Sequence, residues 1–218
     1  MFYMNAIEHI RHTIEQDVFD YTQLMHVLSH YRKPRDVVSL LMQKGQIIRV
    51  RKGLYCFGEI WRRNTVSHEM LANLVYGPSV ISLDYALAWY GLIPEHVSGF
   101  TSVTINRSRN FDTPLGRFLY VHLSEKRFAF GNTIHNSGQV NWLIAEPLKA
   151  LADKVWADKR FRPTSPASFA DYLFKDLRID EHTLADFFIE RNVNDLVENY
   201  AARKVTWMVE FLGKRIKG

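Results

Sequence analysis

Residues 20–57 read DYTQLMHVLSHYRKPRDVVSLLMQKGQIIRVRKGLYCF. Asp20 can cap a short helix, and Gln23 three residues later completes a capping box. Pro34 suits the first turn of a following helix, where its missing N–H costs no hydrogen bond. The apolar residues at helical spacing are Leu24, Val27 and Leu28 in the first helix and Val37, Leu40 and Leu41 in the second. The pattern therefore predicts two short helices joined by a tight turn.

Two β runs follow the second of these helices. Gly45 supplies the left-handed residue that ends the helix, after which Gln46–Arg51 and Leu54–Phe57 read as paired strands with Lys52–Gly53 at the tip. A further helix is predicted upstream, from Asn5 to Gln16. Three helices followed by a two-stranded wing is the order of a winged helix-turn-helix.

Positive charge is concentrated on these elements. Residues 32–63 contain nine Lys and Arg against two acidic residues, a net charge of +7 in a chain whose total is +5. Clustered cations on one module favour a polyanionic partner more strongly than the overall charge does. We therefore expect this module to bind double-stranded DNA, although the same cations could also form a solvated face without a partner.

The candidate contacts divide by their chemistry. Arg35, Ser39 and Gln43 follow one face of the second helix, where Arg can bond guanine and Gln can bond adenine in the major groove. The remaining candidates suit phosphates or the wing contact, and they are Arg32, Lys33, Lys44, Arg49, Arg51 and Lys52. Arg49 and Arg51 are two apart, so a regular strand would place them on the same side.

Composition limits the other possibilities. The chain has 218 residues, of which 47% are hydrophobic and 23% charged, which is typical of a globular protein. Cys56 is the only cysteine, so no intramolecular disulfide can form, and we expect it to pack as a small apolar side chain. No run of 18 apolar residues and no secretory leader is apparent, so we expect a soluble, cytoplasmic protein without a membrane partner.

The rest of the chain predicts a second domain. We expect an α+β protein with a winged helix-turn-helix at 1–58, a linker at 59–64, and a mixed α/β domain with antiparallel strands and a helical tail at 65–218. The predicted elements are a helix at Ser67–Val75, a strand at Ser79–Ile81, a helix at Leu83–Tyr90, strands at Thr101–Asn106 and Gly116–Leu123, and helices from Glu146 onward. Asn110–Pro114 is predicted to be a turn that makes those two strands an antiparallel pair. The last helix is predicted to run unbroken from Asp195 to Leu212, with Val197, Ala201, Val205, Met208 and Leu212 as its apolar stripe.

Three segments in this order resemble the AbiEi family of antitoxins from bacterial abortive-infection toxin–antitoxin operons. They are RKGLY (51–55), PSVISLDYAL (78–87) continuing to GLIPE (91–95), and TSVT (101–104) followed by RFLYVHL (117–123). The resemblance covers roughly the first 125 residues, and the helical tail after Glu146 is less diagnostic.

The resemblance implies a winged helix that represses its own operon by binding inverted repeats in the promoter. It also implies an antitoxin, active in phage defence, that counters a nucleotidyltransferase-like toxin without a stable complex. By the same resemblance, the residues expected to contact DNA are Arg32, Lys33, Arg35, Arg49, Arg51 and Lys52. Ser82, Tyr85 and Arg117 are the candidates for an antitoxic surface, although Ser82 also suits the role of a helix cap. Two copies per operator would match the dyad of such repeats.

Two alternatives remain. The protein could be a plain transcription regulator whose C-terminal domain senses a ligand, or a metal-dependent DNA nuclease using Asp112, Glu125 and Lys126. We do not expect an enzyme, because Glu125 and Lys126 are adjacent and cannot share one strand face. We expect neither a cofactor nor a native metal site, since the His pairs at 9 and 12 and at 26 and 30 have no evident third ligand.

Overall fold

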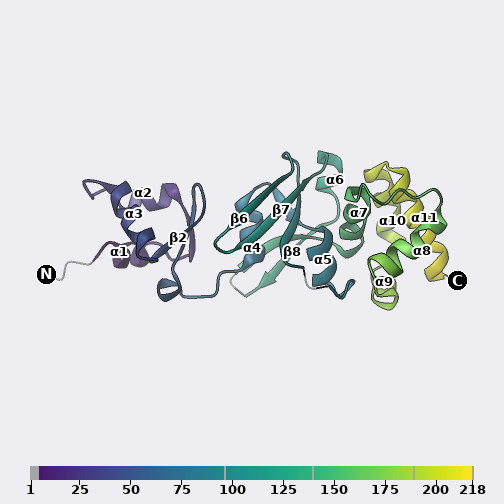
Figure 1. The fold of residues 1–218 in the computed structure, drawn as a ribbon, viewed down its shortest axis with the longest axis horizontal. Coiled ribbons are helices and arrows are strands. Elements are labelled where there is room, and N and C mark those ends of the chain that lie inside the picture. Colours follow the sequence, from purple (N-terminus) through teal and green to yellow (C-terminus); the bar gives the residue numbers. More distant parts are fainter. Residues whose placement is uncertain (1–4, 96, 139, 189, 218) are drawn as a thin grey trace.

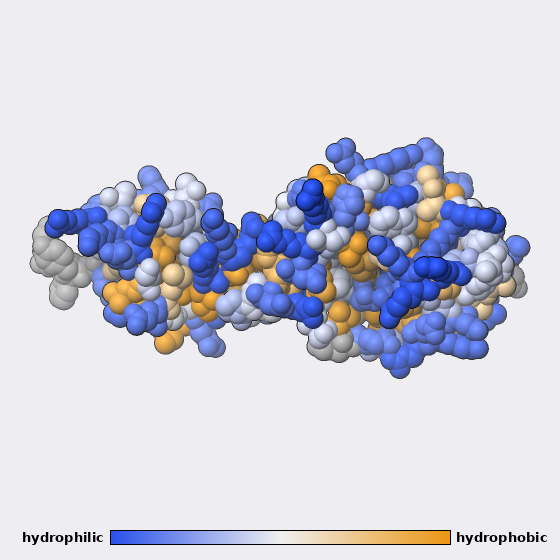
Figure 2. Space-filling model, turned by 45° about the horizontal axis from the view of Figure 1, so that its top comes forward, coloured by the Kyte–Doolittle hydropathy of each residue, from blue (hydrophilic) through white to orange (hydrophobic). Residues whose placement is uncertain are grey.

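The computed structural model describes residues 5–95, 97–138, 140–188 and 190–217. Within them the protein is a mixed α+β structure with one antiparallel and one mixed sheet. The molecule is elongated, with the N-terminus at one end, the larger sheet in the middle and the last helices at the other end (Figure 1). Figure 2 shows a smaller N-terminal lobe joined through a narrower waist to a larger lobe. We call them the N-terminal unit (residues 5–57) and the second unit (residues 66–217).

The N-terminal unit packs three helices on a three-stranded antiparallel sheet of order β1-β3-β2. Its elements are α1 (Ala6–Thr13), β1 (Val18–Asp20), α2 (Tyr21–Val27), α3 (Pro34–Gln43), β2 (Ile47–Arg51) and β3 (Leu54–Phe57). The core between helices and sheet includes Ile10, Leu24, Leu41, Ile47 and Phe57, each less than 5% exposed. One sheet face and one face of each helix are thereby removed from water.

Most helices and strands of this unit agree with the prediction, which was based on local sequence signals. The Asp20 carboxylate accepts a hydrogen bond from the backbone N–H of Gln23 at 2.8 Å. The side-chain oxygen of Gln23 in turn accepts from the backbone N–H of Asp20. Pro34 opens α3, and Gly45 follows its end with φ +64°. The helix predicted from Asn5 to Gln16 ran three residues too far at its C-terminal end, because Ile14 is already extended. Strand β1 was not predicted at all, since three residues are too short for a periodic signal.

The buried stripe of α3 differs from the prediction. Val38 and Leu41 are buried, Val37 is half-buried, and Leu40 is 48% exposed. Spacings of three and four residues place residues 37, 40 and 41 on one helical face, and the same rule places residues 38 and 41 together. The second face differs from the first by a rotation of about one residue. The helix is rotated toward Val38, which leaves Leu40 on the outer side.

A connection of mixed character follows the N-terminal unit. Residues Glu59–Trp61 form a short 3-10 helix, η1, and residues 62–67 form no regular helix or strand. Arg63, Asn64 and Thr65 are exposed, as suits the predicted linker at 59–64.

The second unit is built on a six-stranded sheet of order β6-β7-β5-β4-β9-β8. Its strands are β4 (Ser79–Ile81), β5 (Phe100–Thr104), β6 (Arg109–Thr113), β7 (Gly116–His122), β8 (Asn132–Ser137) and β9 (Val140–Ala145). Its helices up to the tail are α4 (His68–Val75), α5 (Leu83–Trp89), α6 (Glu125–Ala129) and α7 (Pro147–Ala157). Helix α4 packs on β4, β5 and β9, while α5 packs on β5 and α7.

The predicted strand pairing was wrong. β5 and β7 are parallel, with Val103 opposite Val121, rather than an antiparallel pair. Residues predicted as the turn between them belong to β6, which pairs antiparallel with β7, as Phe111 does with Phe118. The tight turn lies one step later, where Thr113 is opposite Gly116. The β8–β9 hairpin was also missed, because its exposed strand carries little apolar alternation.

The helical tail is broken where a single long helix was predicted. It comprises η2 (Pro166–Ser168), α8 (Phe169–Asp171), a π-helical turn (Tyr172–Asp176), α9 (Glu181–Phe187), α10 (Glu190–Tyr200) and α11 (Arg203–Lys217). Ala201 has φ +45° and is exposed, so it separates α10 from α11. The predicted stripe survives only in α11, where Val205, Met208 and Leu212 are fully buried. No helix in the described parts of the chain combines the length and apolarity needed to cross a bilayer.

Candidate nucleic-acid interface

The outer face of α3 is open to solvent. Arg35, Ser39 and Gln43 are all exposed, as predicted, on the side of the helix away from buried Val38 and Leu41. The Ser39 hydroxyl donates to the Arg35 carbonyl at 3.0 Å, so its proton is engaged and its oxygen is left as an acceptor. The face therefore offers a guanidinium, a hydroxyl and an amide in a row, the groups that read base edges.

Cations lie at both ends of this face. Arg32 and Lys33 precede α3 and Lys44 follows it, and all three are exposed. Lys33 is 3.9 Å from Asp36, and both side chains are 74% exposed. Such an exposed pair contributes little, about 0–1 kcal/mol, so Lys33 can exchange this partner for a phosphate.

The wing does not place its two arginines together. A bulge lies between Arg49 and Arg51, where Arg49 is opposite Tyr55 but Arg51 is opposite Leu54. Paired residues in an antiparallel ladder share a face, so the two arginines lie on opposite faces. The prediction from their spacing was wrong, since one extra residue in the strand reverses the alternation.

Arg51 is directed toward the second unit. It is half-buried, and its Nε is buried without a hydrogen-bond partner among the described residues. Its neighbours Val50 and Leu54 belong to the apolar core shared with the second unit. Burial raises the pKa of the Tyr120 hydroxyl, and the positive charge of Arg51 partly opposes that rise. Arg51 is therefore part of the contact between the units, while Arg49 and Lys52 remain exposed.

The sheet of the N-terminal unit packs against the second unit with its other face. Val50, Leu54 and Cys56 belong to the same apolar core as Val66 and Leu71. Burial raises the pKa of the Cys56 thiol to about 11. The thiol is thus protonated at neutral pH and packs as the apolar side chain that was predicted.

Asp17 joins the N-terminal unit to the connection that follows it. Its carboxylate accepts from the Arg11 guanidinium at 2.6 Å and from the amides of Arg63 and Asn64 at 3.0 and 2.9 Å. The Arg11 guanidinium also lies 4.1 Å from the centre of the Phe57 ring. Burial alone would raise the pKa of Asp17, but the two amides and Arg11 outweigh it and lower the pKa. We call this group the Asp17 latch; no sequence motif marked it.

The candidates for an antitoxic surface differ in exposure. Ser82 is fully buried and its side chain caps no helix; its hydroxyl donates to Asp153 at 2.6 Å. Tyr85 is half-buried and donates to Glu69 at 2.5 Å. Arg117 is exposed, 3.5 Å from Asp112 on the neighbouring strand. Of the three, only Arg117 is exposed. Ser82 occupies the predicted N-cap position of α5, but its side chain makes no capping hydrogen bond.

Ser82 instead belongs to a buried polar cluster. Lys149 and Asp153 of α7 are 1% and 0% exposed, and they form an ion pair at 2.7 Å. The Tyr200 hydroxyl of α10 donates to the other oxygen of Asp153. Desolvation and the Asp153 charge raise the pKa of Tyr200 well above its ordinary value. This cluster ties three elements of the second unit together and is closed to solvent.

Two exposed cations of the second unit lie outside the basic segment at 32–63 on which the DNA prediction rests. Arg107 and Arg109 are exposed at the β6 edge, and Arg109 is opposite Tyr120, the residue that Arg51 approaches.

Comparison with known proteins adds no assignment. No family model matches the chain, and no curated protein matches it. Within the described residues, no group of three or more His, Cys, Asp or Glu is placed to hold a metal ion.

Proposed function

We propose that the N-terminal unit is a winged helix-turn-helix that binds double-stranded DNA. The element order α1-β1-α2-α3-β2-β3 and the sheet order β1-β3-β2 support this assignment. The observation that carries it is the outer face of α3, where Arg35, Ser39 and Gln43 stand exposed between flanking cations. A helix with one buried and one hydrogen-bonding face is the element that enters a major groove.

Each exposed side chain then has a distinct role. Arg35 and Gln43 read base edges, while five cations neutralise phosphates. These five are Arg32, Lys33, Lys44, Arg49 and Lys52. Arg51 is left out because it faces the second unit.

Fluorescence anisotropy with a labelled duplex from the region upstream of the coding sequence tests this proposal. Five neutralised phosphates predict a slope of log K against log salt of about −4.5 per subunit. Arg35→Ala should weaken the cognate duplex by about 1–3 kcal/mol and a scrambled duplex much less. Lys52→Ala should weaken both duplexes alike and reduce the slope by about 0.9.

Lys159→Ala is the matched control, because Lys159 is an exposed lysine of the second unit and should leave both duplexes unaffected. A flat salt response, or an equal loss on both duplexes for Arg35→Ala, would show that α3 does not read DNA in this way.

We further propose that the protein represses its own operon and acts as an AbiEi-like antitoxin in abortive infection. The support is the resemblance of the three segments named above. The antitoxic surface then includes exposed Arg117, with Tyr85 half-buried on α5 and Ser82 excluded by its burial.

Co-expression with the adjacent gene tests the second role. Rescue from growth arrest by the wild-type chain, also when Arg35→Ala has removed repression, supports an antitoxin. Absence of rescue supports the plain regulator instead.

A further inference from the structure

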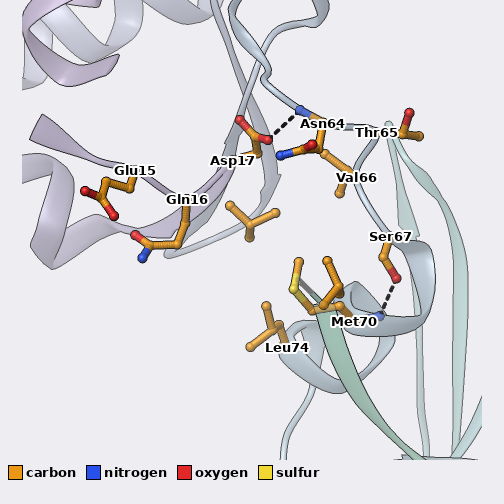
Figure 3. A pocket seen from close by; sticks show the side chains of 11 residues that line it. Glu15, Gln16, Asp17, Asn64, Thr65, Val66, Ser67, Met70 and Leu74 are labelled. Carbon is orange, nitrogen blue, oxygen red and sulfur yellow. Dashed lines mark hydrogen bonds between the residues drawn. The ribbon is translucent and has the colours of Figure 1, made fainter. Parts of the chain in front are cut away.

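A pocket of about 470 Å³ opens where the two units meet. Figure 3 shows Glu15 and Gln16 of the α1–β1 loop on one side, with Met70 and Leu74 of α4 across from them. Val18, Val66 and Val140 complete the apolar part of the wall. A volume of this size lies in the range of small-molecule sites.

The polar groups of the pocket fall into two sets. Asp17 and Ser67 are already satisfied, since Asp17 binds Arg11 and two amides, and the Ser67 hydroxyl accepts from Met70 N and donates to Glu69. The side chains of Glu15, Gln16, Asn64 and Thr65 are exposed and form no hydrogen bond or ion pair with any described residue. Their polar atoms are therefore available to a ligand.

The charge of the pocket is opposite to that of the chain. Among the residues that the structure describes, no Lys or Arg lines the pocket, although the protein has a net charge of +5. Arg11 lies beside Asp17, but its guanidinium is committed to the Asp17 carboxylate and to the carbonyls of Trp61 and Ile14. Glu15 thus supplies a carboxylate that no cation of the described chain neutralises.

We propose that this pocket binds a small organic cation with an apolar or aromatic body and an ammonium group. The body packs on Val18, Met70 and Leu74, and the ammonium donates to Glu15, with Gln16 and Thr65 as neutral partners. Binding here is independent of the proposed DNA contact, since α3 contributes nothing to the pocket.

Methyl NMR of protein labelled at the methionine methyl groups tests the site on the full chain without DNA. The chain has six methionines, and Met70→Leu identifies the signal of Met70. The probes are tryptamine, neutral tryptophol and anionic indole-3-acetate, which share one ring system. Tryptamine should shift the Met70 signal saturably, tryptophol more weakly and indole-3-acetate least, while Met208 stays unchanged.

Two variants test separately the contribution of the apolar wall and that of the Glu15 charge to binding. Leu74→Trp fills the pocket from a 45% exposed position and should abolish the Met70 shift with every probe. Glu15→Gln should weaken tryptamine about two- to five-fold, as the loss of an exposed ion pair predicts, and leave tryptophol unchanged. Glu210→Gln on α11, also exposed, is the control.

The proposal is overturned if no probe shifts Met70 saturably, or if Leu74→Trp leaves the shift intact. Equal binding of tryptamine and indole-3-acetate would equally contradict the role of Glu15. DNA binding by the same samples is measured separately, so failure of the pocket and failure of the DNA proposal give different results.

Discussion

Asp17→Asn should open the connection between the two units. The amides of Arg63 and Asn64 donate to the Asp17 carboxylate, so the backbone of residues 62–64 is held by a charged acceptor. Asparagine keeps one acceptor oxygen but loses the charge and the ion pair with Arg11, whose side chain is only 11% exposed. A hydrogen bond to a charged group contributes about 1.5–3 kcal/mol, part of which the amide retains. We therefore expect the free energy of local opening to fall by about 1–2 kcal/mol.

Trypsin reads this opening directly, because the peptide bonds after Arg62 and Arg63 are the ones that the Asp17 latch holds. When opening is fast relative to cleavage, the cleavage rate follows the population of the open form. A loss of about 1–2 kcal/mol then corresponds to cleavage about 5- to 30-fold faster at these two sites. Mass spectrometry of the early fragments identifies the bond that is cut.

Asp36→Asn is the matched control, since its carboxylate is exposed and pairs with the exposed Lys33. Unchanged cleavage at residues 62 and 63 in Asp17→Asn, with a circular dichroism spectrum equal to that of the wild type, would refute the role of the Asp17 latch.

The remaining predictions concern pH, the wing, the buried cluster and the thiol. Because the pKa of Asp17 is lowered on folding, its contribution to stability is complete above the unfolded value of about 3.9 and is lost as pH falls through the folded value. The difference in unfolding free energy between the wild type and Asp17→Asn should therefore shrink below about pH 4, as urea titrations at pH 3 and pH 6 would show. Arg51→Ala should leave the salt slope of DNA binding unchanged, in contrast to Lys52→Ala, and an equal change in both would place Arg51 on the DNA after all. Asp153→Ala leaves Lys149 buried without its partner and should cost about 3–5 kcal/mol in urea unfolding; a loss under 1 kcal/mol would contradict the buried ion pair. Cys56, with its pKa raised to about 11, should resist a thiol reagent at pH 8 in the native protein and react promptly in urea.

The N-terminal unit was largely predictable because its signals are local. The capping box at Asp20 and Gln23, Pro34 at the start of α3 and Gly45 after its end each act within four residues. Such signals survive whatever the chain packs against.

What the sequence could not give depends on distant partners. Whether β5 pairs with β7 in parallel or antiparallel is decided by where β6 fits, and no residue in either strand records that choice. Ser82 has the sequence context of a cap, but Asp153, 71 residues away, takes its hydroxyl. Ala201 ends α10 with a positive φ that favours glycine, so nothing in the residue type announces the break.

For the candidate site, the exposure of the α3 residues was predictable, but the geometry of the wing was not. Exposure of Arg35, Ser39 and Gln43 followed from helical periodicity, whereas the position of Arg51 depended on a bulge that the period-two rule does not anticipate.

The shared core of the two units has a practical consequence for anyone who shortens this chain. A fragment cut after Gly58 would bring Val50, Leu54 and Cys56 into water on one side of a small sheet. Such a fragment should aggregate and be poorly soluble even with its three helices correctly folded. The two units thus share one apolar core, so residues of the second unit help to set the orientation of the N-terminal unit.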